Sequence, residues 1–228
     1  MSTAQGARAR ARTEVTAAIK EEARRHLAKE GAAKLSLRAV ARDLGMVSSA
    51  LYRYFPSRDE LLTALIIDAY DSLGEAAEQA RDAAADSAPV ARWTAVCEAV
   101  RGWALAHPHE YALIYGSPVP GYAAPQTTVP AAARVGLVLI GIVRDAREHG
   151  GLSELPLPAG LRPEAERMAA DLAPELPPES VAALAAAWAQ LFGLVSFELF
   201  GQFNNVVEDR EAFFRHAAMG LAQGVGLR

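Results

Sequence analysis

Apolar residues recur every three or four positions along most of the chain, which is the spacing of one face of an α-helix. The first segment shows this stripe clearly, in Val15, Ile19, Ala23 and Leu27. We therefore predict a helix over residues 13–30, with Thr13 as its N-cap and Gly31 as its C-terminal stop. No window alternates apolar and polar residues long enough to predict a half-buried β-strand.

The pattern after Gly31 predicts three more helices, over residues 36–44, 48–54 and 58–83. Gly45 separates the first two, because glycine has no Cβ and its backbone tolerates a turn. Ser57 and Glu60 match the Ser-x-x-Glu capping box, which satisfies backbone N–H groups at the start of a helix. The long helix over 58–83 therefore has a clear beginning.

Beyond residue 89 the chain reads as a second all-helical domain with proline-rich breaks. Its predicted helices cover residues 91–106, 108–115, 131–149, 163–172, 179–201 and 210–225. The expected fold class is all-α, with a three-helix N-terminal domain and a C-terminal helical bundle. We place the domains at residues 1–57, with an N-terminal arm over about 1–12, and at 58–228.

Composition narrows the class further. The 228 residues are 51% apolar, which is too apolar for a disordered chain. A single cysteine, Cys97, excludes an internal disulfide framework and fits a reducing compartment. Residues 1–12 lack the apolar segment of a signal peptide. The uncharged stretches 180–197 and 135–143 are interpreted as buried helices, so we expect a cytoplasmic protein with no membrane partner.

Charge is distributed unevenly along the chain. Residues 1–60 contain nine Arg and three Lys against seven acidic residues, a balance of +5, whereas residues 61–228 have a balance of −9. A basic first quarter on an acidic body suggests that only this part meets a polyanion. A solvated, charged helix face is the alternative explanation.

The segment 37–54 has the pattern of a helix-turn-helix. Two helices that cross near a right angle need a small residue where they approach, and Ala41 fits that position. Gly45 then suits a turn with positive φ. The expected buried positions are all apolar or aromatic, namely Val40, Leu44, Met46, Leu51 and either Tyr54 or Phe55. An ordinary helical hairpin is the alternative, but it does not explain the basic flank.

Three runs in this region closely resemble the DNA-binding domain of the TetR family of bacterial transcriptional regulators. They are Ser36-Leu37-Arg38-Ala39-Val40-Ala41, Gly45-Met46 and the run from Ala50 to Leu61, which includes Tyr52-Arg53-Tyr54-Phe55-Pro56. The resemblance extends over about residues 10–75. It implies an N-terminal helix-turn-helix domain, and a C-terminal helical domain for ligand binding and dimerisation.

Roles for individual residues follow from how a short helix lies in the major groove, with its N-terminal residues toward the base edges. Val47, Ser48 and Ser49 are expected to face bases, and Tyr52 to reach a base or a phosphate. The remaining candidates are expected to contact phosphates. Ser36 lies at a helix N-terminus, and Tyr54 would use its hydroxyl unless its ring belongs to the core. Arg38 and Arg53 either bind phosphates or are merely solvated, and Arg58 stands where family members often place a lysine. Arg8, Arg10 and Arg12 form either an arm in the minor groove or a disordered tail.

The resemblance also implies a homodimer built from the last two long helices. The helix over 179–201 is apolar nearly all round, and a symmetric four-helix bundle would cover it. The predicted interface residues are Val181, Leu184, Leu191, Val195, Leu199 and Phe213. A buried core helix of a monomer is the alternative.

Aromatic residues cluster before a Pro/Gly-rich loop, in a Trp-x-x-x-His-Pro-x-x-Tyr run that resembles a subgroup of TetR-like C-terminal domains. They could line a pocket for a small, mostly apolar or aromatic effector. The candidate pocket residues are Trp103, His107, Tyr111, Tyr115, Tyr122, Trp188 and Phe192. The same rings could simply be core. His107 and His109 have no carboxylate or cysteine at ligand spacing, so no metal site is expected, and no cofactor.

No common catalytic motif is present, neither G-x-S-x-G, H-E-x-x-H, a Walker A loop nor G-x-G-x-x-G after a strand. The sequence therefore predicts a ligand-responsive transcriptional regulator and not an enzyme. We expect it to bind a palindromic operator in double-stranded DNA as a homodimer, and to act as a repressor. The alternative is a helical-bundle carrier or enzyme that does not bind DNA.

Overall fold

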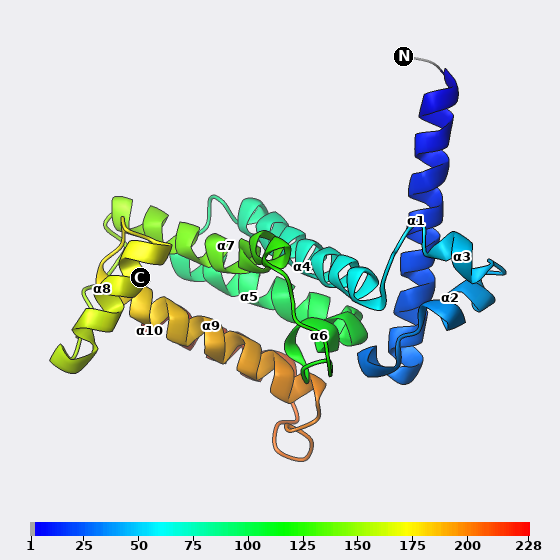
Figure 1. The fold of residues 1–228 in the computed structure, drawn as a ribbon. Helices are drawn as coiled ribbons and strands as arrows, with labels where there is room; N and C mark the ends of the chain where they lie inside the picture. The colour runs from blue at the N-terminus through cyan, green and yellow to red at the C-terminus, as the bar shows by residue number, and fades with distance from the viewer. Residues whose placement is uncertain (1–2) are drawn as a thin grey trace. The chain divides into compact units, whose positions relative to one another are not determined.

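In the computed structural model, residues 3–228 are described, with side chains from residue 6 onward, and they form ten α-helices (Figure 1). The helices are α1 (Thr3–Glu30), α2 (Leu37–Asp43), α3 (Ser48–Leu51), α4 (Arg58–Ala83), α5 (Pro89–Ala106), α6 (Pro108–Tyr115), α7 (Val129–Glu148), α8 (Arg162–Leu172), α9 (Pro178–Leu199) and α10 (Arg210–Gly224). Short 3-10 segments cover Ala32–Lys34, Gln126–Thr128 and Ala159–Leu161. The predicted all-α class is confirmed.

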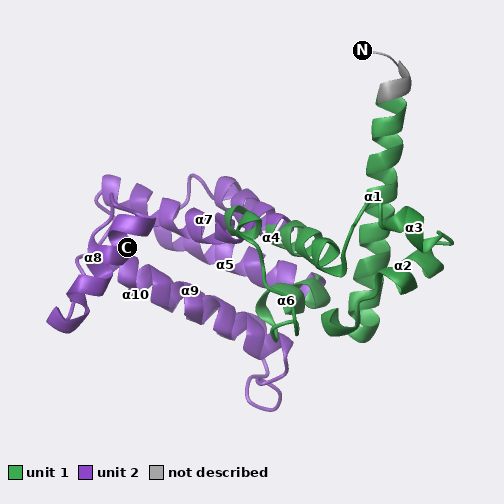
Figure 2. Cartoon of the chain, viewed as in Figure 1, with its two compact units in different colours: residues 1–70, 107–130 green, residues 71–106, 131–228 purple. Residues whose placement is uncertain are grey.

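The chain divides into two compact units (Figure 2). Unit 1 comprises Met1–Tyr70 and His107–Pro130, and unit 2 comprises Asp71–Ala106 and Ala131–Arg228. The division falls inside α4, because the first turns of that helix belong to the core of unit 1. The compact units therefore do not coincide with the predicted domains 1–57 and 58–228.

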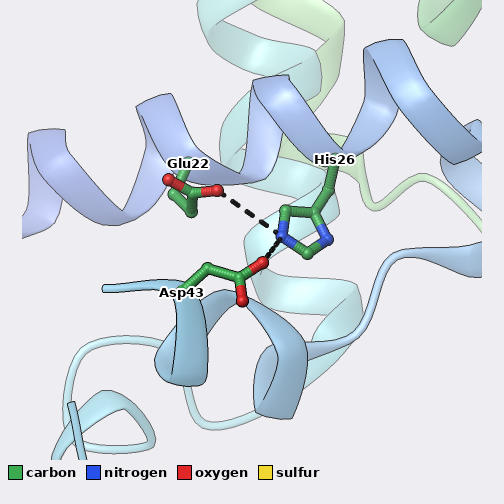
Figure 3. Close-up of side chains that lie close together, drawn as sticks. All are labelled: Glu22, His26 and Asp43. Carbon is green, nitrogen blue, oxygen red and sulfur yellow. Dashed lines mark hydrogen bonds and ion pairs between the residues drawn. The ribbon is translucent and has the colours of Figure 1, made fainter. Parts of the chain in front are cut away.

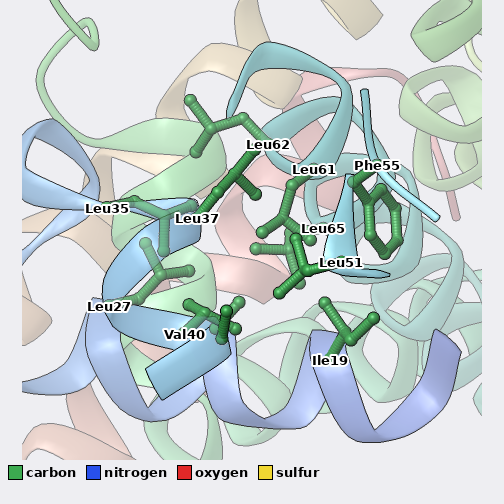
Figure 4. Packing of buried hydrophobic residues seen from close by; sticks show 12 residues of the cluster. Ile19, Leu27, Leu35, Leu37, Val40, Leu51, Phe55, Leu61, Leu62 and Leu65 are labelled. Carbon is green, nitrogen blue, oxygen red and sulfur yellow. The ribbon is translucent and has the colours of Figure 1, made fainter. Parts of the chain in front are cut away.

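The core of unit 1 brings α1, α2, α3 and the start of α4 together (Figure 4). Its buried side chains include Ile19, Leu27, Leu37, Val40, Leu51, Phe55, Leu61, Leu62 and Leu65. Burying each such side chain contributes about 1.5–3 kcal/mol, which offsets the entropy lost in ordering the short α2 and α3. Tertiary packing therefore fixes two helices that are too short to be stable in isolation.

The turn residues adopt the conformations that the sequence predicts. Gly31 ends α1 with φ +77° and Gly45 follows α2 with φ +65°, a region that favours glycine. The Met46 N–H donates to the Ala41 carbonyl oxygen across 2.8 Å, which closes the turn. The Glu60 N–H donates to Ser57 Oγ across 3.1 Å, so the predicted cap at the start of α4 is confirmed.

The beginning of α1 differs from the prediction. The helix already begins at Thr3, and the Thr13 hydroxyl donates to the Ala9 carbonyl oxygen one turn earlier. Thr13 is therefore inside the helix, and the prediction that it caps it is wrong. Arg8 and Arg10 are exposed on the same continuous helix. Alanine and arginine at these positions are strong helix formers, so an apolar stripe is not needed to extend α1. The first two residues of the predicted arm lie outside the described residues.

Unit 2 is a helical bundle in which α10 packs on α5 and α9, and α8 packs on α9. Trp93, Ile142 and Leu191 are fully buried in it. The Arg101 guanidinium on α5 binds the Glu198 carboxylate on α9 through two hydrogen bonds of 2.7 and 2.6 Å. Glu198 is buried, and this paired geometry satisfies both of its carboxylate oxygens.

Two helices, over Gln126–Glu148 and Pro178–Leu199, are long and apolar enough to cross a membrane by length and composition alone. Core helices of globular proteins pass the same test. Ile142 and Leu191 from these two helices lie in the interior of unit 2. Packing in unit 2 thus accounts for the inner side of each helix, whereas Leu137 on α7 and Phe197 on α9 are exposed.

Candidate nucleic-acid interface

The apolar residues of the α2–turn–α3 segment pack into the core of unit 1. Val40, Ala41 and Leu51 are fully buried, and α2 packs on both α1 and α3. A methyl group at Ala41 allows this close approach, as the pattern predicts. The helix α3 ends at Leu51, three residues earlier than predicted, and Tyr54 is half-buried beyond it.

The opposite side of α3 faces solvent. Val47 immediately before the helix is 70% exposed, and Tyr52 directly after it is 41% exposed. Ser49 is exposed and Ser48 half-buried. Because Val47 and Tyr52 are exposed, both side chains are accessible to another molecule. The N-terminal part of α3 thus presents the side chains predicted to face bases.

Polar and basic groups flank this surface. Arg38 on α2 and Arg53 after α3 are exposed. Ser36 is the N-cap of α2, yet among the described residues its hydroxyl makes no capping hydrogen bond. The hydroxyl and the N-terminal amides of α2 are therefore available to an anion. By contrast, Lys20 and Arg24 of α1 are both paired with Asp68 at 2.8 Å.

Tyr54 lies beneath the first half of α1. The guanidinium carbon of Arg12 is 5.2 Å from the centre of the Tyr54 ring, a cation–π contact. The same guanidinium lies 3.5 Å from the Arg53 carbonyl oxygen. Arg12, predicted to belong to a minor-groove arm or a disordered tail, instead packs on the end of the helix-turn-helix.

Arg58 has internal partners. Its Nε donates to the Leu35 carbonyl oxygen across 3.1 Å, and one terminal nitrogen donates to the carbonyl oxygens of Ala32 and Ala33 across 2.9 and 3.2 Å. The side chain thus caps the 3-10 segment between α1 and α2. A phosphate role was predicted from the resemblance alone, and the structure gives this guanidinium a different set of acceptors.

The predicted dimer residues separate into two groups. Val181, Leu184, Leu191 and Val195 are at most 5% exposed inside unit 2, and Leu199 is half-buried. Side chains that are buried within one chain have almost no surface left to contact a partner chain. The prediction that the first four residues form the dimer interface is therefore corrected. They form the inner face of α9. Phe213 on α10 is 41% exposed, so its predicted place in the dimer interface stays a prediction.

A different face of α9 and α10 is apolar and accessible. A groove of about 600 Å³ runs along it, lined by Gln190, Gly193, Leu194, Phe197, Phe203, Phe213, Ala217, Gly220 and Leu221. The ring centres of Phe197 and Phe203 are 5.6 Å apart, and those of Phe203 and Phe213 are 5.5 Å apart. We call Phe197, Phe203 and Phe213 the aromatic row. Sequence reasoning missed Phe197 because α9 is apolar on every side, and it missed Phe203 because this residue lies in the turn after α9.

The predicted pocket residues lie in both units. His107, Tyr111, Tyr115 and Tyr122 belong to unit 1, where Tyr122 shares a 2.8 Å hydrogen bond with Thr63. The other three belong to unit 2, where Trp103 is buried and donates to Ser72 Oγ, and Trp188 packs edge-on against Phe192. Of the seven, Trp188 alone lines the groove described next.

This second groove lies among α7, α8 and α9 of unit 2 and has a volume of about 500 Å³, within the usual range of small-molecule sites. Its lining is almost wholly apolar, with Asp171 as the one ionisable side chain; it consists of Ala132, Ala133, Gly136, Leu137, Leu139, Ile140, Asp171, Leu172, Val181, Leu184, Ala185 and Trp188. We call it the α7–α9 groove. Its chemistry suits an apolar guest rather than a charged one.

A packed helix pair with a tight glycine turn, an exposed second helix and exposed arginines on the same segment are the features of a helix-turn-helix DNA-binding protein. Comparisons with known proteins agree. Residues 19–65 match the model described as bacterial regulatory proteins of the tetR family, and residues 93–221 match the tetracyclin repressor-like C-terminal domain. The chain belongs to the TetR family of transcriptional regulators.

Individual relatives support the same assignment. The HTH-type transcriptional regulator Rv1816 of Mycobacterium tuberculosis is 42% identical over 210 residues, which cover 87% of this chain and 86% of the relative. Mb1846 of Mycobacterium bovis matches with the same identity and coverage. The crystal structure of SCO4313 is 34% identical, with a TM-score of 0.75 over 94% of this chain and 98% of that one. Rv1816 and Mb1846 are named as HTH-type transcriptional regulators and SCO4313 as a regulatory protein, which agrees with the family assignment.

Proposed function

We propose that this regulator binds a palindromic operator as a homodimer, represses transcription there, and loses affinity when a small, mostly apolar effector binds. The observation that carries the proposal is the exposed end of α3, where Val47 and Tyr52 face solvent beside Arg38 and Arg53. Such a surface fits the major groove and its flanking phosphates.

The proposed contacts divide by chemistry. Val47 touches a thymine methyl group, while Ser48 and Ser49 bond base edges. Tyr52 reaches a base or a phosphate, and the Ser36 hydroxyl and the two exposed arginines bind phosphates. Tyr54 contributes through its hydroxyl alone, because its ring is packed under Arg12. We leave Arg58 out of the contact set, since three backbone carbonyl groups already accept its hydrogen bonds.

Dimerisation is proposed through the aromatic row on α9 and α10. Phe197 is 52% exposed and Phe213 is 41% exposed, and both line the same apolar groove. Exposed apolar patches of this kind mark interfaces, and packing two such faces about a twofold axis forms a four-helix bundle. One helix-turn-helix reads only a few base pairs, so a symmetric pair also supplies the specificity that an operator requires.

The effector is proposed to bind in the α7–α9 groove. Leu137, Ile140 and Trp188 supply apolar walls, and Asp171, whose carboxylate is paired with Arg167 across 3.0 Å, is the one ionisable side chain in the lining. We propose that binding changes the separation of the two α3 helices away from the ~34–36 Å that matches successive major grooves. A coupling of ~1–3 kcal/mol between the two sites is enough to change operator affinity 5–150-fold. Because the operator lies in the cell's DNA, we place the protein in the cytoplasm.

The test is a titration of duplexes selected from a random pool, at about 50 and 200 mM salt, with a scrambled duplex as the control. The expected result is selection of a palindrome, two chains bound per duplex, and affinity that falls steeply at the higher salt because phosphate contacts release counterions. Equal affinity for the selected and scrambled duplexes would contradict the proposed operator binding.

Effector sensing has its own test. A panel of apolar and aromatic compounds is added to the operator complex, and the affinity is measured again. The variant Trp188→Ala should keep the effector-free operator affinity and lose the response, whereas Phe200→Ala, which removes an exposed ring outside the α7–α9 groove, should keep both. An unchanged response in Trp188→Ala would place the effector elsewhere.

A further inference from the structure

Three side chains that could bind a cation converge between α1 and α2 of unit 1 (Figure 3). Glu22 and His26 lie one turn apart on α1, and Asp43 is the last residue of α2. His26 Nε2 is 2.9 Å from Asp43 Oδ2 and 3.5 Å from Glu22 Oε1. One ring nitrogen thus faces an oxygen from each of two carboxylates, and all three atoms lie within 4.8 Å of one another.

Arginines hold both carboxylates in this orientation. Glu22 Oε2, the oxygen that turns away from His26, is paired with Arg25, and Asp43 Oδ1 accepts a 3.0 Å hydrogen bond from Arg42 Nε. Each carboxylate therefore presents one oxygen inward while its other oxygen is fixed from outside, an arrangement typical of metal ligands.

The two separations from His26 Nε2 are close to those of atoms that share one small metal ion. Two ligand atoms that each lie ~2.0–2.1 Å from Zn²⁺ are ~2.9 Å apart at a right angle and ~3.3 Å apart at a tetrahedral angle. The distance from His26 Nε2 to Asp43 Oδ2 is 2.9 Å, and the distance to Glu22 Oε1 is 3.5 Å, slightly longer than the tetrahedral value. The side chains of Glu22 and His26 are only 10% and 11% exposed. Water would therefore seldom displace these two ligands from a bound ion.

We infer that Glu22, His26 and Asp43 form a binding site for a divalent transition metal ion of the Zn²⁺ class. Imidazole nitrogen favours such ions over Ca²⁺ and Mg²⁺, and three protein ligands leave one or more positions to water. Binding requires Nε2 without a proton, so the ion displaces that proton to solvent while Nδ1 keeps its own.

The site has a structural consequence within unit 1. Asp43 lies two residues before Gly45, the turn that leads into α3, whereas Glu22 and His26 belong to α1. A shared ion would replace the hydrogen bond between His26 of α1 and Asp43 of α2 with coordinate bonds from both helices. Metal binding is therefore expected to raise the thermal midpoint of the protein and to restrain the end of α2.

The experiment uses the full chain without an affinity tag, treated with a chelator and then dialysed. Zn²⁺ is titrated by calorimetry, and Co²⁺ is added separately because its visible absorption reports coordination by protein ligands. We expect one ion per chain. His26→Gln and Asp43→Asn should each lose at least about tenfold in affinity and the Co²⁺ absorption band. His216→Gln, which changes an exposed histidine on α10, is the matched control and should bind as the unaltered chain does.

Two results would overturn the inference. One is the absence of Zn²⁺ binding to the unaltered chain, which would leave His26 as a hydrogen-bonded bridge between carboxylates. The other is equal Zn²⁺ affinity in Asp43→Asn and the unaltered chain. Asp43 is exposed at a helix end, so this variant folds even if His26→Gln does not, and circular dichroism of each variant verifies folding.

Discussion

Arg58 Nε donates a hydrogen bond to the Leu35 carbonyl oxygen across 3.1 Å, which connects the first turn of α4 to a residue two positions before α2. The same guanidinium bonds two further carbonyl oxygens in the 3-10 segment between α1 and α2. The Ala32 carbonyl oxygen also accepts a hydrogen bond from the Leu35 N–H, and the arginine supplies a charged donor to all three carbonyl groups.

Arg58→Met should therefore destabilise the protein more than it weakens DNA binding. Loss of hydrogen bonds from a charged donor costs about 1–3 kcal/mol of the free energy of unfolding, measured by urea denaturation. Arg53→Met is the comparison, since its side chain is exposed. We expect it to leave stability within about 0.5 kcal/mol and to lower the salt dependence of operator binding by about one ion. The reverse ranking would return Arg58 to the DNA contacts.

Tyr52→Ala should weaken operator binding by about 1–3 kcal/mol without changing the oligomeric state, because the side chain projects from unit 1 at 41% exposure. Tyr52→Phe separates the two possible contacts: it keeps ring packing and removes the hydroxyl bond. Affinity is measured by fluorescence anisotropy on the selected operator. If the alanine variant binds as tightly as the unaltered chain, Tyr52 is not part of the interface.

Charged substitutions on the aromatic row should separate the proposed dimer. Phe197→Glu combined with Phe213→Glu places two carboxylates in an apolar contact, where they cannot be solvated. Sedimentation velocity should show a shift from two chains to one. Leu161→Glu makes the same chemical change at a comparably exposed leucine outside α9 and α10, and should leave the dimer intact. A doubly substituted chain that still sediments as a dimer would rule out this face.

Two glycines offer a matched test of packing in unit 2. A Cβ at Gly74 on α4 would lie 2.6 Å from Arg134 Cβ, so Gly74→Ala should cost about 1–3 kcal/mol of stability through overpacking. A Cβ at Gly102 on α5 would meet nothing within 4 Å, so Gly102→Ala should stabilise by about 0.5–1 kcal/mol through helix propensity. Thermal unfolding of both variants provides the measurement; equal shifts would argue against close contact between α4 and α7.

Cys97 should be unreactive in the folded protein. It is fully buried on α5, and burial raises the pKa of its thiol far above neutral pH, so the reactive thiolate is scarce. Ellman's reagent should label less than one tenth of the chains in buffer over an hour and all of them in guanidinium. Fast labelling of the native protein would mean that unit 2 opens locally.

Local signals in the sequence were sufficient for most helix boundaries. Ser57 and Gly45 predict a cap and a turn that depend only on neighbouring backbone groups, and both are confirmed. Thr13 misled the prediction, because a capping residue type followed by an apolar stripe looks the same whether the helix begins there or ten residues earlier. Helix propensity alone extends α1 toward the N-terminus. Propensity produces no repeating apolar pattern, so the earlier start of the helix could not be seen in the pattern.

Long-range partners could not be predicted. Arg58 finds its carbonyl acceptors 23 to 26 residues away, and His26 meets Asp43 at a separation of 17 residues. No motif spacing encodes either approach. The buried side of α9 could not be predicted either. Because the helix has apolar residues on all sides, periodicity does not distinguish Leu191, which is in the core, from Phe197, which is exposed. Only packing against α8 and α10 decides between them.

The three tryptophans differ sharply in environment: Trp93 and Trp103 are buried, whereas Trp188 is 41% exposed and lines the α7–α9 groove. Acrylamide in the bulk solution will therefore quench one indole in preference to the other two. A guest that shields this ring will protect its emission from the quencher. The chain thus contains its own optical reporter, and compound libraries can be screened on the unlabelled protein.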